Sequence, residues 1–391
     1  MTFRRPISPT ERMYFPMRDM APPFLMQLVI TGDGAIDAEQ LRQAVHVAAQ
    51  ACPGARLARR GKEWVDSGVA PAVRVVAGHT TAYPAIETDP VLTSPIGPSP
   101  DSTVEVLLLT GAPTTLVFRV FHGVMDGMGM VLFATSVLRV LRGEEPAELA
   151  DPIADAELVR RIGAPGLPAA MVPTFRTAVG HGRQDRDAPR HLLRRRTIHA
   201  TGAGAVARVA ALLAEQTTGT SRIMMPVDLR RHDPALRSTA NLALPLFLEV
   251  EPGMAWTAVK EQIKTGLTER RELNQMAATR LTMVPDAANR ALLRSLNKMG
   301  ADRGRNLASA TVSHMGRFTH AELAVPGFTP TSIYTLPQHS VAMPLLFGLM
   351  EFDGRTELTV SARNGAGIED RLEALLDRLV RTLEQELPAK P

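Results

Sequence analysis

The sequence predicts an α/β protein with mixed sheets, of the α+β kind, built from two halves. Short apolar runs bounded by Gly, Asp and Pro are typical of strands, and longer runs with apolar residues at helical spacing are typical of helices. The two kinds of element follow one another without the strict alternation of a doubly wound sheet. A length of 391 residues allows two domains of ordinary size.

The first half is assigned to residues 1–160. It is expected to open with a helix at residues 8–12, where a Pro lies just inside the start. Asp37 and Gln40 have the spacing of a capping box and predict a second helix. The remaining elements are strands at 24–31, 64–65, 73–76, 104–109 and 115–121, of which the last two form a hairpin, and a helix at 128–143.

Residues 161–196 are assigned to a crossover segment, because the chain from 144 to 196 is proline-containing, weakly periodic and highly charged. The second half is assigned to residues 197–391. Its expected helices lie at 205–216, 257–276, 286–299 and 368–387, and its expected strands at 222–227, 241–250, 308–314, 344–352 and 356–362.

The amino-acid composition indicates a globular protein and excludes several other classes. Hydrophobic residues make up 45% and charged residues 21%, which is a normal globular balance. Cys52 is the only cysteine, so an internal disulfide and a cysteine-based zinc site are excluded, and no metal site is expected. The sequence has no secretory h-region and no run of about 18 apolar residues, so we expect a cytoplasmic protein without a membrane span.

The net charge of +4 is a mild excess, and no nucleic-acid-binding motif accompanies it. Arginines gather between residues 183 and 196 and end in Arg194, Arg195 and Arg196. Such a run is usually a solvated surface, but it could also dock an anionic donor substrate.

A histidine at the end of an expected strand is the strongest candidate for chemistry. The strand at 115–121 leads into His122, and Asp126 and Gly127 precede the next helix. A neutral imidazole can act as a general base near neutral pH. Asp126 could orient the ring or lock the loop, and Gly127 permits a tight backbone path. His122, Asp126 and Gly127 are therefore the candidate catalytic residues, although a buried His beside an Asp-Gly turn would have the same pattern.

These segments together resemble the chloramphenicol-acetyltransferase-like superfamily, which includes condensation domains and polyketide-associated acyltransferases. The resemblance covers nearly the whole chain. It is carried by the HxxxDG motif at His122–Gly127 and by segments at 8–12, 226–230, 241–245, 311–316 and 353–355.

The resemblance implies two similar halves that form a V with a central tunnel and the catalytic His at its middle. It also implies that Asp126 pairs with Arg230 of the second half. Ser313, His314 and Asn241 are candidate tunnel-lining residues, and Ser313 or an amide near Gly127 could stabilise an oxyanion. Two positions depart from the family pattern: Phe121 replaces the first His of the motif, and His314 replaces an Asn.

The predicted function is acyl transfer from a coenzyme A or carrier-protein phosphopantetheine thioester to a hydroxyl or amine of a small acceptor. No cofactor is expected to be bound, and no Ser or Cys nucleophile motif is present, which favours direct transfer. Two alternatives remain open: cyclisation of a carrier-bound intermediate on the same fold, and a non-catalytic module that binds carrier proteins.

Overall fold

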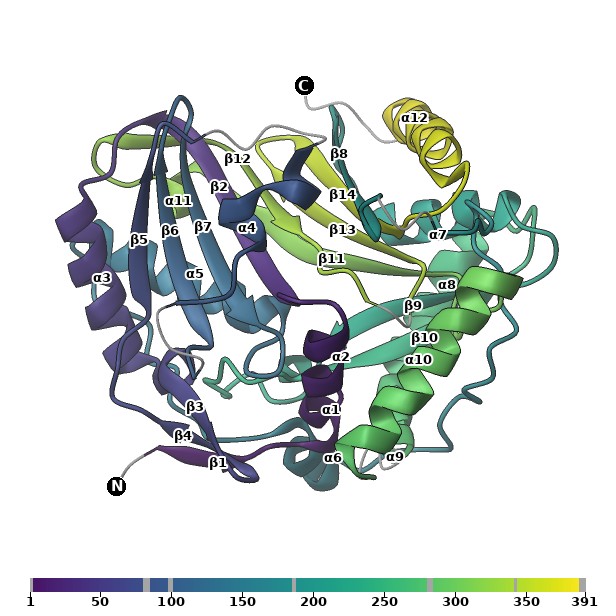
Figure 1. The fold of residues 1–391 in the computed structure, drawn as a ribbon, viewed down its shortest axis with the longest axis horizontal. Coiled ribbons are helices and arrows are strands. Elements are labelled where there is room, and N and C mark those ends of the chain that lie inside the picture. The colour runs from purple at the N-terminus through teal and green to yellow at the C-terminus, as the bar shows by residue number, and fades with distance from the viewer. Residues whose placement is uncertain are drawn as a thin grey trace.

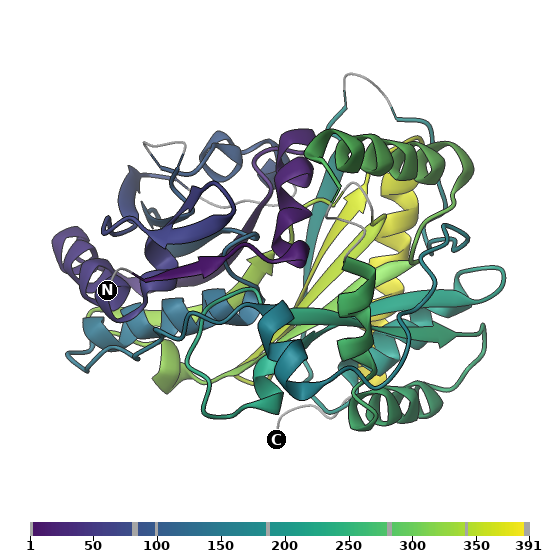
Figure 2. The ribbon, with the colours of Figure 1, turned by 90° about the horizontal axis from the view of Figure 1, so that it is seen from below.

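The computed structural model describes residues 3–79, 85–97, 101–184, 188–279, 284–340 and 343–386. Within these ranges the strands form a five-stranded, a six-stranded and a three-stranded sheet. Figures 1 and 2 show the two larger sheets side by side, with helices packed around them. This arrangement of mixed sheets and helices confirms the predicted fold class. No helix in the described part of the chain combines the length and apolar character that a membrane crossing requires.

The five-stranded sheet carries the candidate catalytic motif. Its order is β12-β2-β7-β6-β5, in which β5 and β6 are parallel and the other neighbours are antiparallel. Every residue of β7 is buried, because α3 and α5 cover one face and a second apolar cluster covers the other. The bounds are β2 (Leu25–Gly34), β5 (Ala72–Ala77), β6 (Val104–Thr110), β7 (Thr114–Phe121), β12 (Phe328–Leu336), α3 (Ala38–Ala51) and α5 (Gly127–Leu141).

The six-stranded sheet has the order β10-β9-β11-β13-β14-β8. β11 runs parallel to both of its neighbours, and the other pairs are antiparallel. Helices α7, α8 and α12 pack beside this sheet (Figure 1). The bounds are β8 (His191–Ile198), β9 (Ser221–Asp228), β10 (Ala243–Val250), β11 (Ala310–Phe318), β13 (Leu345–Phe352), β14 (Arg355–Arg363), α7 (Ala205–Glu215), α8 (Trp256–Thr268) and α12 (Ile368–Glu386).

The three-stranded sheet has the order β1-β4-β3 and lies at the N-terminal end of the chain. Its strands are β1 (Arg4–Pro6), β3 (Leu57–Arg60) and β4 (Glu63–Asp66). The remaining helices are α1 (Pro9–Arg12), α2 (Tyr14–Met20), α4 (Pro90–Thr93), α6 (Asp155–Ile162), α9 (Met276–Thr279), α10 (Asp286–Arg303) and α11 (His320–Leu323). The short helices η1 (Pro53–Arg56), η2 (Ala85–Thr88), η3 (Leu229–His232) and η4 (Arg271–Gln275) complete the described elements.

The two halves share a sheet. Strand β12 comes late in the chain but pairs with β2 of the first half, with Ile333 opposite Ile30. Its sequence contains Pro330, which cannot donate a ladder hydrogen bond, and this is tolerated because β12 lies at the edge of the sheet. The division at residues 160 and 196 therefore does not follow the sheets: β12 crosses it, and residue 196 lies inside β8.

Most of the expected elements are confirmed, and the exceptions have physical reasons. Strand β8 was predicted to be part of an irregular crossover, because its three consecutive arginines hide the strand pattern. Strand β12 was missed because of its proline. The helix expected at 257–276 ends at Thr268, where Arg270 takes a left-handed conformation and a short 3-10 turn follows.

The three arginines of β8 are held by carboxylates of the protein itself. Arg194 is 5% exposed and pairs with Glu87 at 3.2 Å, with Glu373 at 2.6 Å, and with Glu369. Arg195 contacts Glu357 at 2.8 Å. These ion pairs join β8 to α12, to β14 and, through Glu87, to the first half of the chain.

Arg196 also pairs with Glu373. Because each guanidinium faces a carboxylate, the arrangement favours a structural role for Arg194, Arg195 and Arg196 over the predicted docking of an anionic donor. Arg186, in the same basic run, lies outside the described residues.

We expect Arg194→Leu to lower the free energy of unfolding by about 3 kcal/mol, because Glu87, only 8% exposed, would lose its cationic partner in a buried site. Arg196→Leu is the matched control. Its side chain is 30% exposed, so its loss should cost about 1 kcal/mol or less. Urea denaturation measures both variants, and equal losses would contradict the structural assignment.

Candidate active site

The HxxxDG motif forms the junction between β7 and α5. β7 ends at Phe121, and a tight turn follows in which the Val124 amide donates to the Phe121 carbonyl at 3.0 Å. Asp126 is the N-cap of α5, and its Oδ1 accepts a hydrogen bond from the Gly129 amide at 2.6 Å. The spacing of the motif thus has a local cause: a strand end, a turn and a helix cap follow in that order.

The His122 ring has a defined orientation. Its Nδ1 lies 3.2 Å from the Met125 carbonyl oxygen. A carbonyl oxygen only accepts, so this hydrogen bond forms when the proton is on Nδ1, and Nε2 then keeps its lone pair. The Asn241 side-chain amide, a donor 3.3 Å from the same nitrogen, faces Nδ1 in the other form of the ring. Within the described part of the chain, Nε2 has no hydrogen-bond partner. His122 is partly exposed, so Nε2 is available to a substrate.

Asn241 from the second half holds the same residue. Its side-chain amide donates to the His122 carbonyl at 2.8 Å and lies 3.3 Å from Nδ1. Asn241, predicted to line a tunnel, is buried beside the histidine instead of forming an open wall. The second half therefore contributes to the position of His122.

Burial lowers the pKa of His122 below its ordinary value. The backbone hydrogen bonds and the Asp126 charge oppose this shift without cancelling it. The imidazole is consequently neutral at pH 7, which is the form that a general base requires.

Asp126 points away from the histidine and toward the second half. Its Oδ2 lies 3.0 Å from Arg230 Nη1 and accepts from the Leu242 amide at 2.7 Å. With the Gly129 amide on Oδ1, the carboxylate faces a donor on each side and is 1% exposed. This geometry joins the two halves and gives Asp126 no contact through which to relay a proton from His122.

Arg230 is also surrounded by hydrogen-bond partners. It donates to the carbonyls of Ser238 at 2.8 Å and Ala240 at 2.7 Å, and it pairs with Asp228 at 2.7 Å. The two anions raise the pKa of Arg230 although its burial opposes them. The guanidinium therefore stays charged and holds η3 against the HxxxDG motif.

Two glycines let α5 approach the second half closely. A β-carbon on Gly129 would lie 2.2 Å from the Thr239 carbonyl oxygen, a backbone atom that cannot swing aside. A β-carbon on Gly127 would lie 2.6 Å from the end of the Met315 side chain. Gly127 was singled out from the motif, whereas Gly129 was not, because only the tertiary structure brings Thr239 to it.

The remaining predicted site residues lie on β11. His314 is exposed and pairs with Glu351, 2.9 Å away, which Arg317 also contacts at 2.7 Å. His314 is therefore a satisfied polar residue of the sheet. Ser313 is partly buried and points to the opposite face from Val312, which lies in the core of the second half.

Arg5 is a site residue that the sequence pattern did not indicate. Its Nη2 donates to the Val124 carbonyl, inside the motif, at 3.0 Å. Its charge is balanced by Glu11, 2.6 Å away, which also accepts from the Trp64 indole. Burial raises the pKa of Glu11 to about 7, although Arg5 opposes the shift. Arg5 thus fixes the motif from the N-terminal side.

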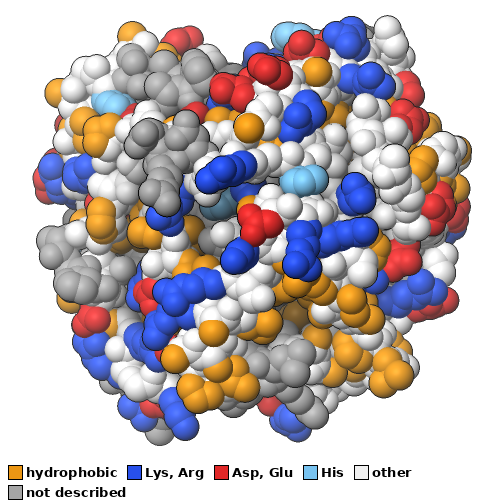
Figure 3. Space-filling view, turned by 45° about the vertical axis from the view of Figure 1, so that its right-hand side comes forward, with side chains coloured by type: hydrophobic (Ala, Val, Ile, Leu, Met, Phe, Trp, Pro, Cys, Tyr) orange, Lys and Arg blue, Asp and Glu red, His pale blue; other side chains and the backbone are white. Residues whose placement is uncertain are grey.

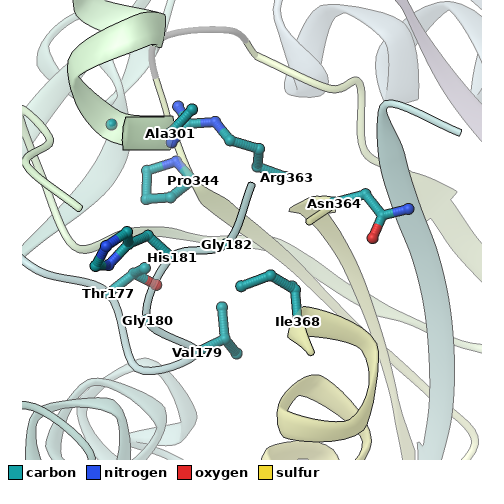
Figure 4. Close-up of a pocket in the computed structure, with 11 residues that line it drawn as sticks. Thr177, Val179, Gly180, His181, Gly182, Ala301, Pro344, Arg363, Asn364 and Ile368 are labelled. Carbon is teal, nitrogen blue, oxygen red and sulfur yellow. The ribbon is translucent and has the colours of Figure 1, made fainter. Parts of the chain in front are cut away.

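A small cavity lies elsewhere, between the segment around Gly180–Gly182, the end of β14 and the start of α12. Figure 4 shows His181, Pro344, Arg363 and Ile368 around it. None of the residues that line this cavity contacts His122, so it is not part of the candidate active site.

We expect Asp126→Asn to lower the free energy of unfolding by about 3 kcal/mol, because Arg230 loses its buried partner and an amide group replaces an acceptor among three donors. Asp228→Asn is the matched control, since this partner of Arg230 is 34% exposed, and we expect a loss of about 1 kcal/mol. Urea denaturation gives both values. Unchanged stability of Asp126→Asn together with lost turnover would instead assign the carboxylate a direct part in the reaction.

Comparison with protein-family models and with curated protein sequences gives no match. Solved structures do match. The starter condensation domain of rhizomide synthetase in complex with C8-CoA is 17% identical with a TM-score of 0.63, and the match covers 98% of this chain and 94% of that one.

The condensation domain of the Monacolin K polyketide synthase is 13% identical with a TM-score of 0.62 over 99% and 98% of the two chains. The epimerization domain of the third module of tyrocidine synthetase B is 13% identical with a TM-score of 0.55 over 99% of each. The chain therefore has the chloramphenicol-acetyltransferase-like fold of condensation domains.

Proposed function

We propose that the protein transfers an acyl group from a thioester to a hydroxyl or amine acceptor, with His122 as the general base. The observation that carries the proposal is the hydrogen bonding and the protonation of the His122 imidazole. When Nδ1 donates a hydrogen bond to the Met125 carbonyl, Nε2 is left as a proton acceptor, and burial lowers the pKa so that the ring is neutral.

The reaction follows from these features. Nε2 takes the proton of the acceptor as its oxygen or nitrogen attacks the thioester carbonyl. The tetrahedral oxyanion then collapses and expels the thiolate, which receives the proton from the imidazolium and leaves as a thiol. An amide near Gly127, at the start of α5, or the Ser313 hydroxyl is proposed to stabilise the oxyanion.

The donor is proposed to be an acyl-coenzyme A or an acyl group on a carrier protein's phosphopantetheine. The rhizomide synthetase domain has been crystallised with C8-CoA, and also with C8-CoA together with Leu-SNAC, an aminoacyl thioester. Both donor types are anionic. Lys and Arg side chains gather across the middle of the face in Figure 3, which would attract such a donor.

A second candidate is a rearrangement of a carrier-bound intermediate, such as epimerisation or cyclisation. The similarity to an epimerization domain favours it, because the same fold then hosts proton transfer without acyl transfer. Mass spectrometry of protein incubated with an acyl thioester and acceptors separates the candidates. Acyl transfer joins the acyl group to the acceptor and releases a thiol. Epimerisation leaves the mass unchanged in H₂O but adds one deuterium at the epimerised carbon in D₂O, and a binding module leaves both substrates intact in either solvent.

We expect His122→Ala to lose about 10²–10⁴-fold in kcat with an alcohol acceptor, because a positioned base contributes on that order. Donor binding should be retained. His46→Ala is the control, since His46 is exposed on α3 and bonds only Gln50 among its described neighbours. Unchanged turnover of an alcohol by a folded His122→Ala protein would refute His122 as the base.

The pH dependence has a defined sign. His122 must be neutral to accept a proton, so kcat/KM should rise with pH as the free enzyme loses that proton. Because burial lowers the pKa of His122, the rise should lie below the ordinary histidine value of about 6.5. A rising limb centred above pH 6.5 that is absent from His122→Ala would contradict the lowered pKa.

A further inference from the structure

We propose that His191, His339 and Arg190 bind the phosphate of a phosphopantetheine handle, and that the two histidines take up a proton when the phosphate arrives. The inference rests on the proposed function, because a thioester on coenzyme A or on a carrier protein brings this phosphate with it. It adds a binding site and a pH dependence that do not involve the proposed base.

The two histidine rings are stacked at the edge of the six-stranded sheet. Their centroids are 5.0 Å apart and their planes differ by 2°. His191 is the first residue of β8, the edge strand, and His339 lies in the segment between β12 and β13. Both side chains are partly exposed, so a ligand can reach them.

Two arginines add positive charge beside the stack. Arg363, the last residue of β14, is directly opposite His191 in the β8–β14 pair, and such residues have their side chains on the same face of a sheet. Arg190 precedes His191 and is exposed. Its Nη1 donates to the Met20 carbonyl of α2 at 3.4 Å. Four basic side chains from three segments of the chain therefore meet beside α2.

Arg363 is a fixed charge under this cluster. Its Nη1 donates to Asn306 Oδ1 at 3.3 Å, and a β-carbon on Gly300 of α10 would lie 2.4 Å from the same nitrogen. Figure 4 shows the side chain reaching toward α10 beside Pro344. Burial lowers the pKa of Arg363 to about 10, so the guanidinium is still charged at neutral pH.

These surroundings keep the stacked histidines neutral in the free protein. Burial lowers the pKa of His339 well below its ordinary value, and the charges of His191, Arg363 and Arg190 lower it further. Burial also lowers the pKa of His191. A phosphate beside the rings would oppose this shift, because an anion favours the protonated form of an imidazole. Phosphate binding and proton uptake therefore strengthen each other.

The carboxylates of the neighbouring helices have other partners. Asp19, near the end of α2, pairs with Arg290 of α10 at 3.0 Å, and Glu369, at the start of α12, pairs with Arg194. Within the described part of the chain, no ion pair joins a carboxylate to Arg190 or to either stacked histidine. The cluster thus has an excess of positive charge that an anionic ligand can balance.

The stacked histidines and the HxxxDG turn lie at the same end of the five-stranded sheet. Leu25 of β2 pairs with Phe121, and Gln27 pairs with Leu336, the last residue of β12. β7 and β12 therefore end side by side on either edge of β2. His339 follows three residues after the end of β12.

Helix α2 measures the separation between the phosphate site and the proposed base. Tyr14, its first residue, has its ring centroid 4.3 Å from that of His122, and Met20, its last residue, contacts Arg190. Seven helical residues span about 10 Å. The pantetheine arm connects the phosphate to the thioester, and it is flexible and long enough to bridge a separation of this order.

The test is isothermal titration calorimetry of the full chain with 3′-dephospho-coenzyme A. A phosphate monoester changes its charge near pH 6, whereas the diphosphate of this probe does not, so a pH dependence of binding comes from the protein. Because the histidine pKa rises in the complex, affinity should fall as pH rises. We expect binding to be about tenfold tighter at about pH 5.5 than at about pH 7.5, with an enthalpy at pH 5.5 that depends on the buffer because protons are taken up.

Two further ligands define what is bound. Pantetheine, which lacks the phosphate, should bind more weakly than dephospho-coenzyme A and without proton uptake. 4′-Phosphopantetheine separates the two sources of the handle. Affinity equal to that of dephospho-coenzyme A at pH 7.5 supports a phosphate site that a carrier protein also satisfies, and weaker binding supports one that requires coenzyme A.

Variants assign the proton to the stack. His191→Phe/His339→Phe keeps two flat rings that cannot be protonated, so proton uptake and the pH dependence should be lost. His199→Phe, at an exposed histidine just after β8, is the matched control and should keep both. Arg190→Gln should weaken the binding of dephospho-coenzyme A about tenfold at both pH values, because a charged hydrogen-bond donor is lost.

Proton uptake that persists in the folded double variant would overturn the proposal, as would equal affinities for dephospho-coenzyme A and pantetheine. If the double variant does not fold, each single phenylalanine variant is titrated, and unchanged uptake in both would overturn it as well. The titrations need no acceptor and no turnover, and His122→Ala should give the same values. A failure of the proposed function is therefore distinguishable from a failure of this inference.

Discussion

The structure depends on one buried ion pair, between Asp126 of the HxxxDG motif and Arg230 of the second half. A carboxylate that is removed from water must be compensated by donors, and Asp126 is surrounded by Arg230 and the amides of Gly129 and Leu242. One of these donors comes from its own helix and two come from the other half. The start of α5 is thereby held at a fixed distance from η3 and β10.

The position of His122 is a consequence of the Asp126–Arg230 ion pair. His122 lies between the end of β7 and the cap of α5, so a fixed strand and a fixed cap leave its backbone little freedom. Asn241 reaches the His122 carbonyl because the neighbouring Leu242 is hydrogen-bonded to Asp126, which brings this segment to the turn. Arg5 restrains the Val124 carbonyl from the other side. The contacts of Asp126 are therefore those of a residue that positions the turn.

The two halves are not separable bodies connected only at the site. Strand β12 extends the first sheet with a segment from the second half, and Arg194 of β8 reaches Glu87 of the first half. The contact between α2 and α10 adds a third connection. Their joint effect is to keep the two sheets in one arrangement around the HxxxDG turn, against which α2 itself packs through the Tyr14 ring, 4.3 Å from that of His122.

Local patterns in the sequence were sufficient for much of the fold. The apolar run of β7 and the helix that follows the motif depend on neighbours within a few residues, and the sequence alone predicted both. The same holds for the amphipathic helix α12 and for the β13–β14 hairpin. The capping of α5 by Asp126 was not predicted, although it is also a local interaction. The pairing of Asp126 with Arg230 was expected only from the resemblance to a family, since no local pattern relates residues 104 positions apart.

Only the tertiary structure decided the rest. β12 and β8 are edge strands whose Pro330 and arginines contradict a strand pattern, and they are stable because partner strands and carboxylates compensate them. The orientation of His122 depends on the Met125 carbonyl and on Asn241, an amide 119 positions later in the chain. A sequence determines which groups can donate, accept or stack, whereas the directions of those interactions exist only after distant segments have packed together.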